Sequence, residues 1–75
     1  MPRTNVDKVA TNYRRFNDFV RGELRRRKIR QDSLAEYLNV SRSTITNRLN
    51  GNIEWSLRDA FKTIEFLGAD LTEIL

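Results

Sequence analysis

The segment from residue 31 to residue 51, QDSLAEYLNVSRSTITNRLNG, limits the possible folds more than any other part of the chain. Its first eight residues carry apolar side chains at spacings that fall on one helical face. These are Leu34, Ala35 and Leu38. Asn39 follows directly, and Asn tolerates the left-handed conformation that often ends a helix. We therefore expect a short helix over 31–38, then a tight turn with Val40 buried in it.

A second short helix is expected over 42–49, because Ser41 can cap it with its side-chain oxygen and the Asn50-Gly51 pair is a strong turn signal. Only Ile45 and Leu49 are apolar in this helix. Its other residues can form hydrogen bonds: Arg42, Ser43, Thr44, Thr46, Asn47 and Arg48. A helix held by two apolar residues exposes most of its surface, so we expect this one to serve recognition. Thr44 is expected to support the helix locally beside Ser41.

This stretch resembles the helix-turn-helix of the phage Cro/repressor family. The residues that match the family pattern are Gln31, Leu34, Ala35, Leu38, Val40, Ser41, Ser43, Thr44, Ile45, Asn50 and Gly51. The resemblance extends more loosely from about Val20 to Leu75. It implies an all-α fold, a five-helix lambda-repressor-like DNA-binding domain, with the helix-turn-helix unit at 31–51. The family's first helix usually begins near Phe16, so the first helix here is extended.

The N-terminal part of the chain predicts one long helix from about Val6 to near Lys28. Apolar residues recur every three or four positions along it, at Val9, Tyr13, Phe16, Val20 and Leu24. The apolar residues of the extension, 6–15, either pack on this domain's core or contact a partner subunit. Gly22 inside the helix either allows close packing or marks a slight bend. We expect residues 1–5 to be a disordered tail and residues 6–75 to form a single domain.

The C-terminal part predicts two more helices. Ser56 caps the first, which has a 3.6-residue period and ends at Gly68. Its apolar residues are Leu57, Ala60, Phe61, Ile64 and Leu67. Asp70 with Glu73 marks the start of the second. Leu71, Ile74 and Leu75 line one side of it, where they form either a dimer interface or part of the monomer core. Trp55 is expected to cover the core, the alternative being an exposed contact with DNA or a subunit.

Charge is unevenly distributed along the chain. Residues 1–30 hold ten Lys or Arg and three Asp or Glu, whereas residues 51–75 hold two basic and five acidic residues. This asymmetry favours a basic face that meets a polyanion. The chain has no Cys and no His, and it shows no Gly-rich phosphate loop or clustered carboxylates. We therefore expect neither an enzyme nor a metal or other cofactor.

Two departures from the family pattern concern the end of the first helix. The family usually has Gly near Lys28 and Ser or Thr near Arg30, and both changes add charge close to where family members approach the DNA backbone.

At the positions of Leu24 and Leu49, many relatives carry a buried Arg and Glu that pair. Exchange of both partners for apolar residues is often neutral or stabilising. The change predicts direct contact between Leu24 and Leu49.

The resemblance, together with the hydrogen-bonding chemistry of the side chains, assigns roles to individual residues. The second helix of the unit would enter the major groove, where base pairs present distinct donors and acceptors. The expected base-reading residues are Arg42, Ser43, Thr46 and Asn47. The expected phosphate-binding residues are Gln31, Arg30, Lys28, Arg27, Arg48 and Asn50. Arg48 alternatively contacts a base or pairs with a surface acid.

The sequence therefore indicates a sequence-specific regulator of transcription that binds double-stranded DNA, a phage or bacterial repressor. We expect a homodimer on operator DNA, no membrane segment, and a cytoplasmic, nucleoid-associated location in a bacterial cell. The alternative is a protein–protein module, such as an antitoxin component, with the same fold. The polar second helix of the unit favours DNA, since a partner protein would favour an apolar one. The chain is either a whole Cro-like protein or the DNA-binding part of a longer repressor.

Overall fold

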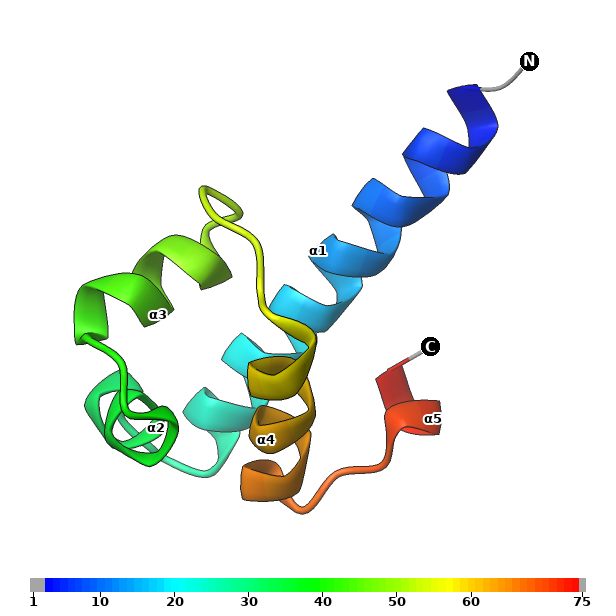
Figure 1. Cartoon of the computed structure of the whole chain (residues 1–75). Coiled ribbons are helices and arrows are strands. Elements are labelled where there is room, and N and C mark those ends of the chain that lie inside the picture. The colour runs from blue at the N-terminus through cyan, green and yellow to red at the C-terminus, as the bar shows by residue number, and fades with distance from the viewer. Residues whose placement is uncertain (1–2, 75) are drawn as a thin grey trace.

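Five helices make up the computed structural model, which describes residues 3–74, except for the side chains of residues 3–10 and 71. They are α1 (Arg3–Arg26), α2 (Gln31–Leu38), α3 (Arg42–Leu49), α4 (Leu57–Leu67) and α5 (Leu71–Ile74) (Figure 1). The described residues contain no strand. The expected all-α, five-helix architecture with a long first helix is therefore confirmed.

Helix α1 differs from the expectation at both ends. It begins at Arg3, inside the segment expected to be a disordered tail, and residues 1 and 2 of that tail lie outside the described residues. It ends at Arg26, because Lys28 adopts a left-handed conformation with φ +57°. The N–H of Ile29 then donates to the carbonyl of Leu24 at 2.8 Å, which closes the helix end. The N-terminal half of α1 projects beyond the other helices (Figure 1).

Helices α2 and α3 have the predicted bounds, because the residues between them fix both ends. Asn39 takes the left-handed conformation at φ 59°, and the N–H of Val40 donates to the carbonyl of Ala35 at 3.0 Å. Ser41 Oγ then accepts from the N–H of Thr44 at 3.1 Å, and the two hydroxyls lie 2.9 Å apart. The expected cap of α3, and the local role of Thr44, are confirmed.

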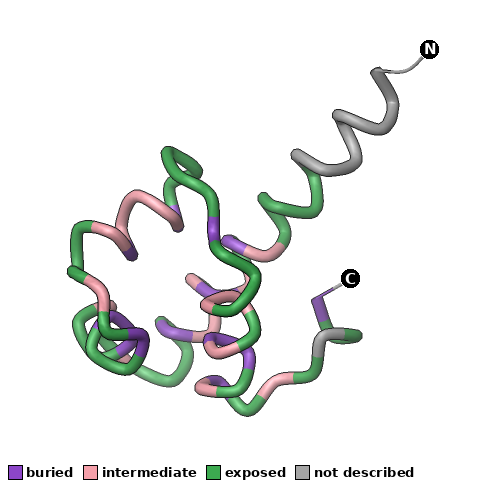
Figure 2. The backbone as a smooth tube through the Cα atoms, viewed as in Figure 1, coloured by how far each residue is buried: buried purple, intermediate pink, exposed green. Residues whose placement is uncertain are grey.

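The core lies where α1, α2, α3 and α4 face one another, and Figure 2 shows its buried positions on the inner sides of these helices. Its buried residues are Val20, Leu24, Leu34, Ala35, Leu38, Ile45, Leu49, Trp55 and Leu67. Leu24 and Leu49 belong to this one cluster, so α1 and α3 meet through apolar side chains. The direct contact between the two residues stays a prediction.

Trp55 covers the core as predicted. Its side chain is 7% exposed, and its indole Nε1–H donates to Oδ1 of the buried Asn17 at 2.7 Å. The ring also stands edge-on to Phe16, with 5.2 Å between the centroids. A buried indole needs a hydrogen-bond acceptor, and Asn17 on α1 supplies it. The segment after α3 is thereby tied to the first helix.

Helix α4 has the expected ends, but two residues of its apolar period lie outside the core. Ser56 Oγ accepts from the N–H of Asp59 at 3.1 Å, and Gly68 ends the helix at φ 65°. However, Leu57 is 72% exposed and Phe61 is 51% exposed, although the apolar period placed both with the core residues. Thr63 is fully buried instead, because its hydroxyl donates to the carbonyl of Asp59 at 2.8 Å.

Helix α5 begins as predicted, with Glu73 Oε2 accepting from the N–H of Asp70 at 3.0 Å. Ile74, expected in a dimer interface or in the monomer core, is 8% exposed, and α5 packs against α1. Ile74 is thus buried within the monomer itself. The other two residues of that predicted set, Leu71 and Leu75, lie outside the residues whose side chains are described.

Candidate nucleic-acid interface

The outer side of α3 is polar along its whole length. Ile45 and Leu49 anchor the helix at 0% and 1% exposure, so the opposite side faces outward. Arg42 and Ser43 are exposed at its first turn, whereas Thr46 and Asn47 are half-buried along its second turn. All four predicted base-reading residues are thus at least partly accessible. Asn50 is exposed directly after the helix.

The start of α2 lies against the middle of α3. Thr46 Oγ1 donates to Oε1 of Gln31 at 3.0 Å, and this contact joins a predicted base reader to a predicted phosphate ligand. Because the Gln31 carbonyl oxygen is occupied, the amide NH2 group remains to donate to an anion. Arg30 occupies the N-cap position of α2, but no side chain makes a capping hydrogen bond there. Backbone N–H groups at such a helix start attract phosphate.

An acidic residue that the sequence did not suggest lies between two of the predicted DNA contacts. Asp32 approaches Arg30 at 3.5 Å and Arg42 at 3.3 Å. All three side chains are about half exposed or more, so water screens these pairs and each is weak. Asp32 therefore holds Arg42 at the edge of α3 without burying it. Arg42 can exchange this carboxylate for a base or a phosphate.

The turn after α3 is held by asparagines. The N–H of Asn52 donates to the carbonyl of Asn47 at 2.8 Å, and its side-chain Nδ2 donates to Asn47 Oδ1 at 3.3 Å. Gly51 between them has φ +82°, which strongly favours glycine. The Asn47 amide is thereby oriented with its NH2 group as the open donor. Asn52 is therefore a residue that positions the Asn47 side chain.

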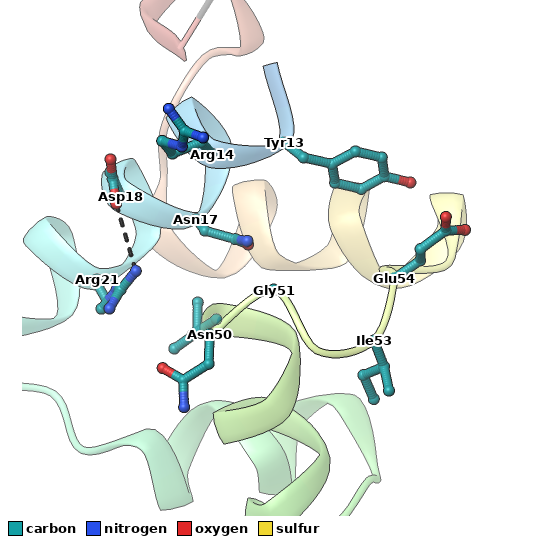
Figure 3. Close-up of a pocket in the computed structure, with 10 residues that line it drawn as sticks. Tyr13, Arg14, Asn17, Asp18, Arg21, Asn50, Gly51, Ile53 and Glu54 are labelled. Atoms are coloured by element: carbon teal, nitrogen blue, oxygen red, sulfur yellow. Dashed lines mark hydrogen bonds and ion pairs between the residues drawn. The ribbon is translucent and has the colours of Figure 1, made fainter. Parts of the chain in front are cut away.

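A cavity of about 560 Å3 lies between α1 and this turn (Figure 3). Arg14 and Arg21 line its α1 side together with Asp18, which pairs with Arg21 at 3.4 Å. Asn50 lines the opposite side. The cavity thus lies at the C-terminal end of α3, and its charges are mixed.

The Arg48 side chain does not lie on the accessible polar side of α3. Its Nη1 is 2.9 Å from Asp59 Oδ2 on α4, and its guanidinium lies 5.2 Å from the centre of the Trp55 ring. The Arg48 and Asp59 side chains are only 12% and 17% exposed, and Arg48 Nε is buried without a hydrogen-bond partner. Of the three roles expected for Arg48, a phosphate contact, a base contact and pairing with an acid, the pairing is the one observed. Arg48 joins α3 to α4 and is a poor candidate for a phosphate contact.

The basic end of α1 is partly neutralised by one carboxylate. Glu23 binds Arg26 at 2.6 Å and Arg27 at 2.9 Å. Its hydrogen bond with Arg26 contributes most to lowering the pKa of the Glu23 carboxyl below its usual range. The crowding of positive charge is therefore relieved within the helix itself, and Arg27 is an ion-paired cation. Lys28 and Arg30 are exposed beyond it.

A family model described as Helix-turn-helix matches residues 22–74, which is more than half of the chain. The chain belongs to the Cro/C1-type helix-turn-helix family. It is accordingly a DNA-binding helix-turn-helix protein of a regulatory family. The match leaves out residues 3–21 of α1, which include its projecting N-terminal half. Comparisons with curated proteins and with solved structures gave no match. In the described part of the helix-turn-helix protein, no helix has both the length and the apolar character to cross a membrane.

Proposed function

We propose that this helix-turn-helix protein is a sequence-specific transcriptional repressor of phage or bacterial type. Helix α3 enters the major groove of an operator half-site, and two copies bind a near-palindromic operator. Arg42, Ser43, Thr46 and Asn47 read base edges. Arg42 suits guanine, with two donors for O6 and N7, and Asn47 suits adenine.

The observation that carries this proposal is the division of α3 into a buried apolar side and an accessible polar side. Ile45 and Leu49 anchor this helix of eight residues in the core, and neighbouring side chains hold its polar residues in place. Gln31 supports Thr46 from α2, Asn52 supports Asn47 from the following turn, and Asp59 holds Arg48 from α4. Side chains with fixed positions lose little entropy on binding, which favours specific recognition.

Positioning on the duplex comes from groups at both ends of the α2–α3 unit. The Gln31 amide and the start of α2, with Arg30 and Lys28, contact the backbone at one end, and Asn50 contacts it at the other. Several such contacts make the affinity strongly salt-dependent, because each neutralised phosphate releases counterions.

Selection of bound sequences from a random duplex pool tests the proposal, since a repressor of this type selects two related half-sites at a fixed spacing. Asn47→Ala in the selected duplex should reduce discrimination against a substituted half-site by about 1–3 kcal/mol. Thr11→Ala, which removes an exposed polar side chain of α1 outside the α2–α3 unit, is the matched control. Unchanged discrimination by Asn47→Ala in gel shifts would show that α3 is not the reading helix.

A further inference from the structure

The cavity between α1 and the turn after α3 has two chemically different ends. Arg14, Asp18 and Arg21 lie at one end, whereas Tyr13 and Glu54 lie at the other (Figure 3). The first end therefore has two positive charges and one negative charge, and the second carboxylate of the lining lies away from them. The cavity lining is neutral as a whole, but this part of it, which we call the Arg21 end, is cationic.

Arg21 is available to an anionic ligand. Its pair with Asp18 spans 3.4 Å, and the two side chains are 42% and 63% exposed. Water screens such a pair, so it contributes little. Arg21 also gives Asp18 only its Nη2 group, whereas a guanidinium can offer a phosphate two parallel N–H donors. A phosphate can therefore replace the Asp18 carboxylate as the partner of Arg21.

Asn50 supplies a second donor from the other wall of the cavity. It is exposed at the C-terminal end of α3, and its backbone N–H already donates to the carbonyl of Thr46 at 3.0 Å. Its side-chain NH2 group is therefore the donor with which Asn50 can bind a ligand. The Arg21 end thus combines a guanidinium from α1 with an amide that directly follows α3.

We propose that the Arg21 end of the cavity holds a phosphate of the DNA backbone, with Arg21 and the Asn50 amide as donors and Arg14 as a further cation. The inference rests on the proposed function, in which Asn50 contacts the backbone beyond the C-terminal end of α3. The strand that reaches Asn50 then passes the cavity, so the contact extends from the α2–α3 unit to α1. Arg14 and Arg21 lie outside residues 22–74, which the family model matches.

A duplex is the source of phosphate that the charges favour. Helix α1 carries seven Lys or Arg and three Asp or Glu, so it attracts a polyanion along its length. A single free phosphate gains less, because Asp18 and Glu54 offset the two arginines of the lining. Phosphates in a strand that α3 already binds are presented at a high effective concentration, so even a weak contact adds to the affinity.

The test compares Arg21→Gln with Arg15→Gln. Both remove one guanidinium from α1 and introduce a residue of similar helix propensity, but Arg15 is exposed outside the cavity lining. On the selected duplex, Arg21→Gln should reduce the slope of log affinity against log salt concentration by about 0.9. Its loss of affinity should therefore be about three to four times larger at about 50 mM than at about 200 mM salt. Arg15→Gln should leave the slope nearly unchanged. Circular dichroism checks that both variants are folded, and equal slopes for the two overturn the proposal.

Single neutral methylphosphonates in the duplex identify the phosphate that Arg21 binds. At that position, the replacement should weaken binding of the wild type and of Arg15→Gln but not of Arg21→Gln. A scan of the duplex in which no phosphate shows this dependence on Arg21 overturns the proposal. Calorimetric titration of the DNA-free protein with inorganic phosphate covers the other source. Binding of inorganic phosphate that is lost in Arg21→Gln, with no such position in the duplex, would assign the cavity to a free anion instead.

Sequence preference separates this inference from the proposed function. Arg21→Gln should weaken binding to selected and random duplexes alike, because a phosphate contact carries no base information. If the wild type prefers no sequence but Arg21→Gln lowers the salt slope, the cavity contact stands and the proposed function fails. If the wild type discriminates between duplexes but Arg21→Gln and Arg15→Gln have equal slopes, the function stands and the cavity contact fails.

Discussion

Lys28 occupies a backbone conformation that suits glycine, and this makes Lys28→Gly an informative variant. The residue has φ +57° at the end of α1, in the hydrogen-bonded turn that connects Leu24 to Ile29. A side chain in the left-handed region costs roughly 1–2 kcal/mol, because its Cβ crowds the backbone. The same side chain carries a positive charge that we expect to face DNA phosphate. Lys28→Gly should therefore raise stability while it lowers affinity for DNA.

The size of the stability change follows from two opposing contributions. Relief of the left-handed conformation is worth about 1–2 kcal/mol, and the greater chain entropy of unfolded glycine takes back about 0.5–1 kcal/mol. The net gain is about 0.5–1 kcal/mol, which raises the melting temperature of a domain this size by about 2–8 °C. Loss of one phosphate contact should reduce the slope of log affinity against log salt concentration by about 0.9.

Thermal unfolding by circular dichroism and a salt series of fluorescence anisotropy on the selected duplex measure both effects. Lys28→Ala is the matched control, since alanine removes the same charge but still has a Cβ in the left-handed region. It should bind all DNA sequences as weakly as Lys28→Gly does, without the gain in melting temperature. Equal melting temperatures for the glycine and alanine variants would refute the argument from backbone strain, and unchanged salt slopes would refute the phosphate contact.

Three further predictions concern groups on or beside α1 and α2. Gly22→Ala should raise stability by about 1 kcal/mol in urea unfolding, because an added Cβ meets no atom within 4 Å and alanine favours the helix. Asp32→Asn should raise affinity for DNA several-fold at low salt in gel shifts, because it frees Arg42 and removes a negative charge near phosphate; weaker binding would show that Asp32 positions Arg42. Since its pKa is lowered in the folded state, Glu23 should stabilise the protein above its ordinary pKa of 4.5 and lose this contribution as the pH falls. Thermal unfolding between pH 3 and 7 should therefore show a smaller acid-induced loss for Glu23→Gln, and an equal loss would contradict this.

The bounds of α2 and α3 could be predicted because local side chains fix them. Asn39 and Ser41 act within four residues of their own positions, and such interactions are visible in the sequence. The same holds for Ser56 at the start of α4. Lys28 shows the limit of this approach: the family comparison indicated a position for glycine, but the residue itself gave no sign that the chain turns there.

Contacts between helices could not be predicted in the same way. The apolar period of α4 shows which residues share a face, but not how far neighbouring helices cover it, so the exposure of Leu57 and Phe61 could not be predicted. The candidate site shows the same limit. The sequence left three roles open for Arg48, and the pairing with Asp59 became visible only in the structure. The ion pairs of Asp32 could not be predicted, because one of its two arginine partners lies in the preceding turn and the other on α3.

The contacts of Trp55 give the protein an intrinsic optical probe. It is the only tryptophan in the chain, so excitation at its absorption edge reports on one site. Its ring touches Phe16, donates to Asn17 and lies beside the guanidinium of Arg48, so α1 and α3 both meet at a single fluorophore. Emission from this indole can follow unfolding and any shift of α3 against α1 on DNA without an attached dye.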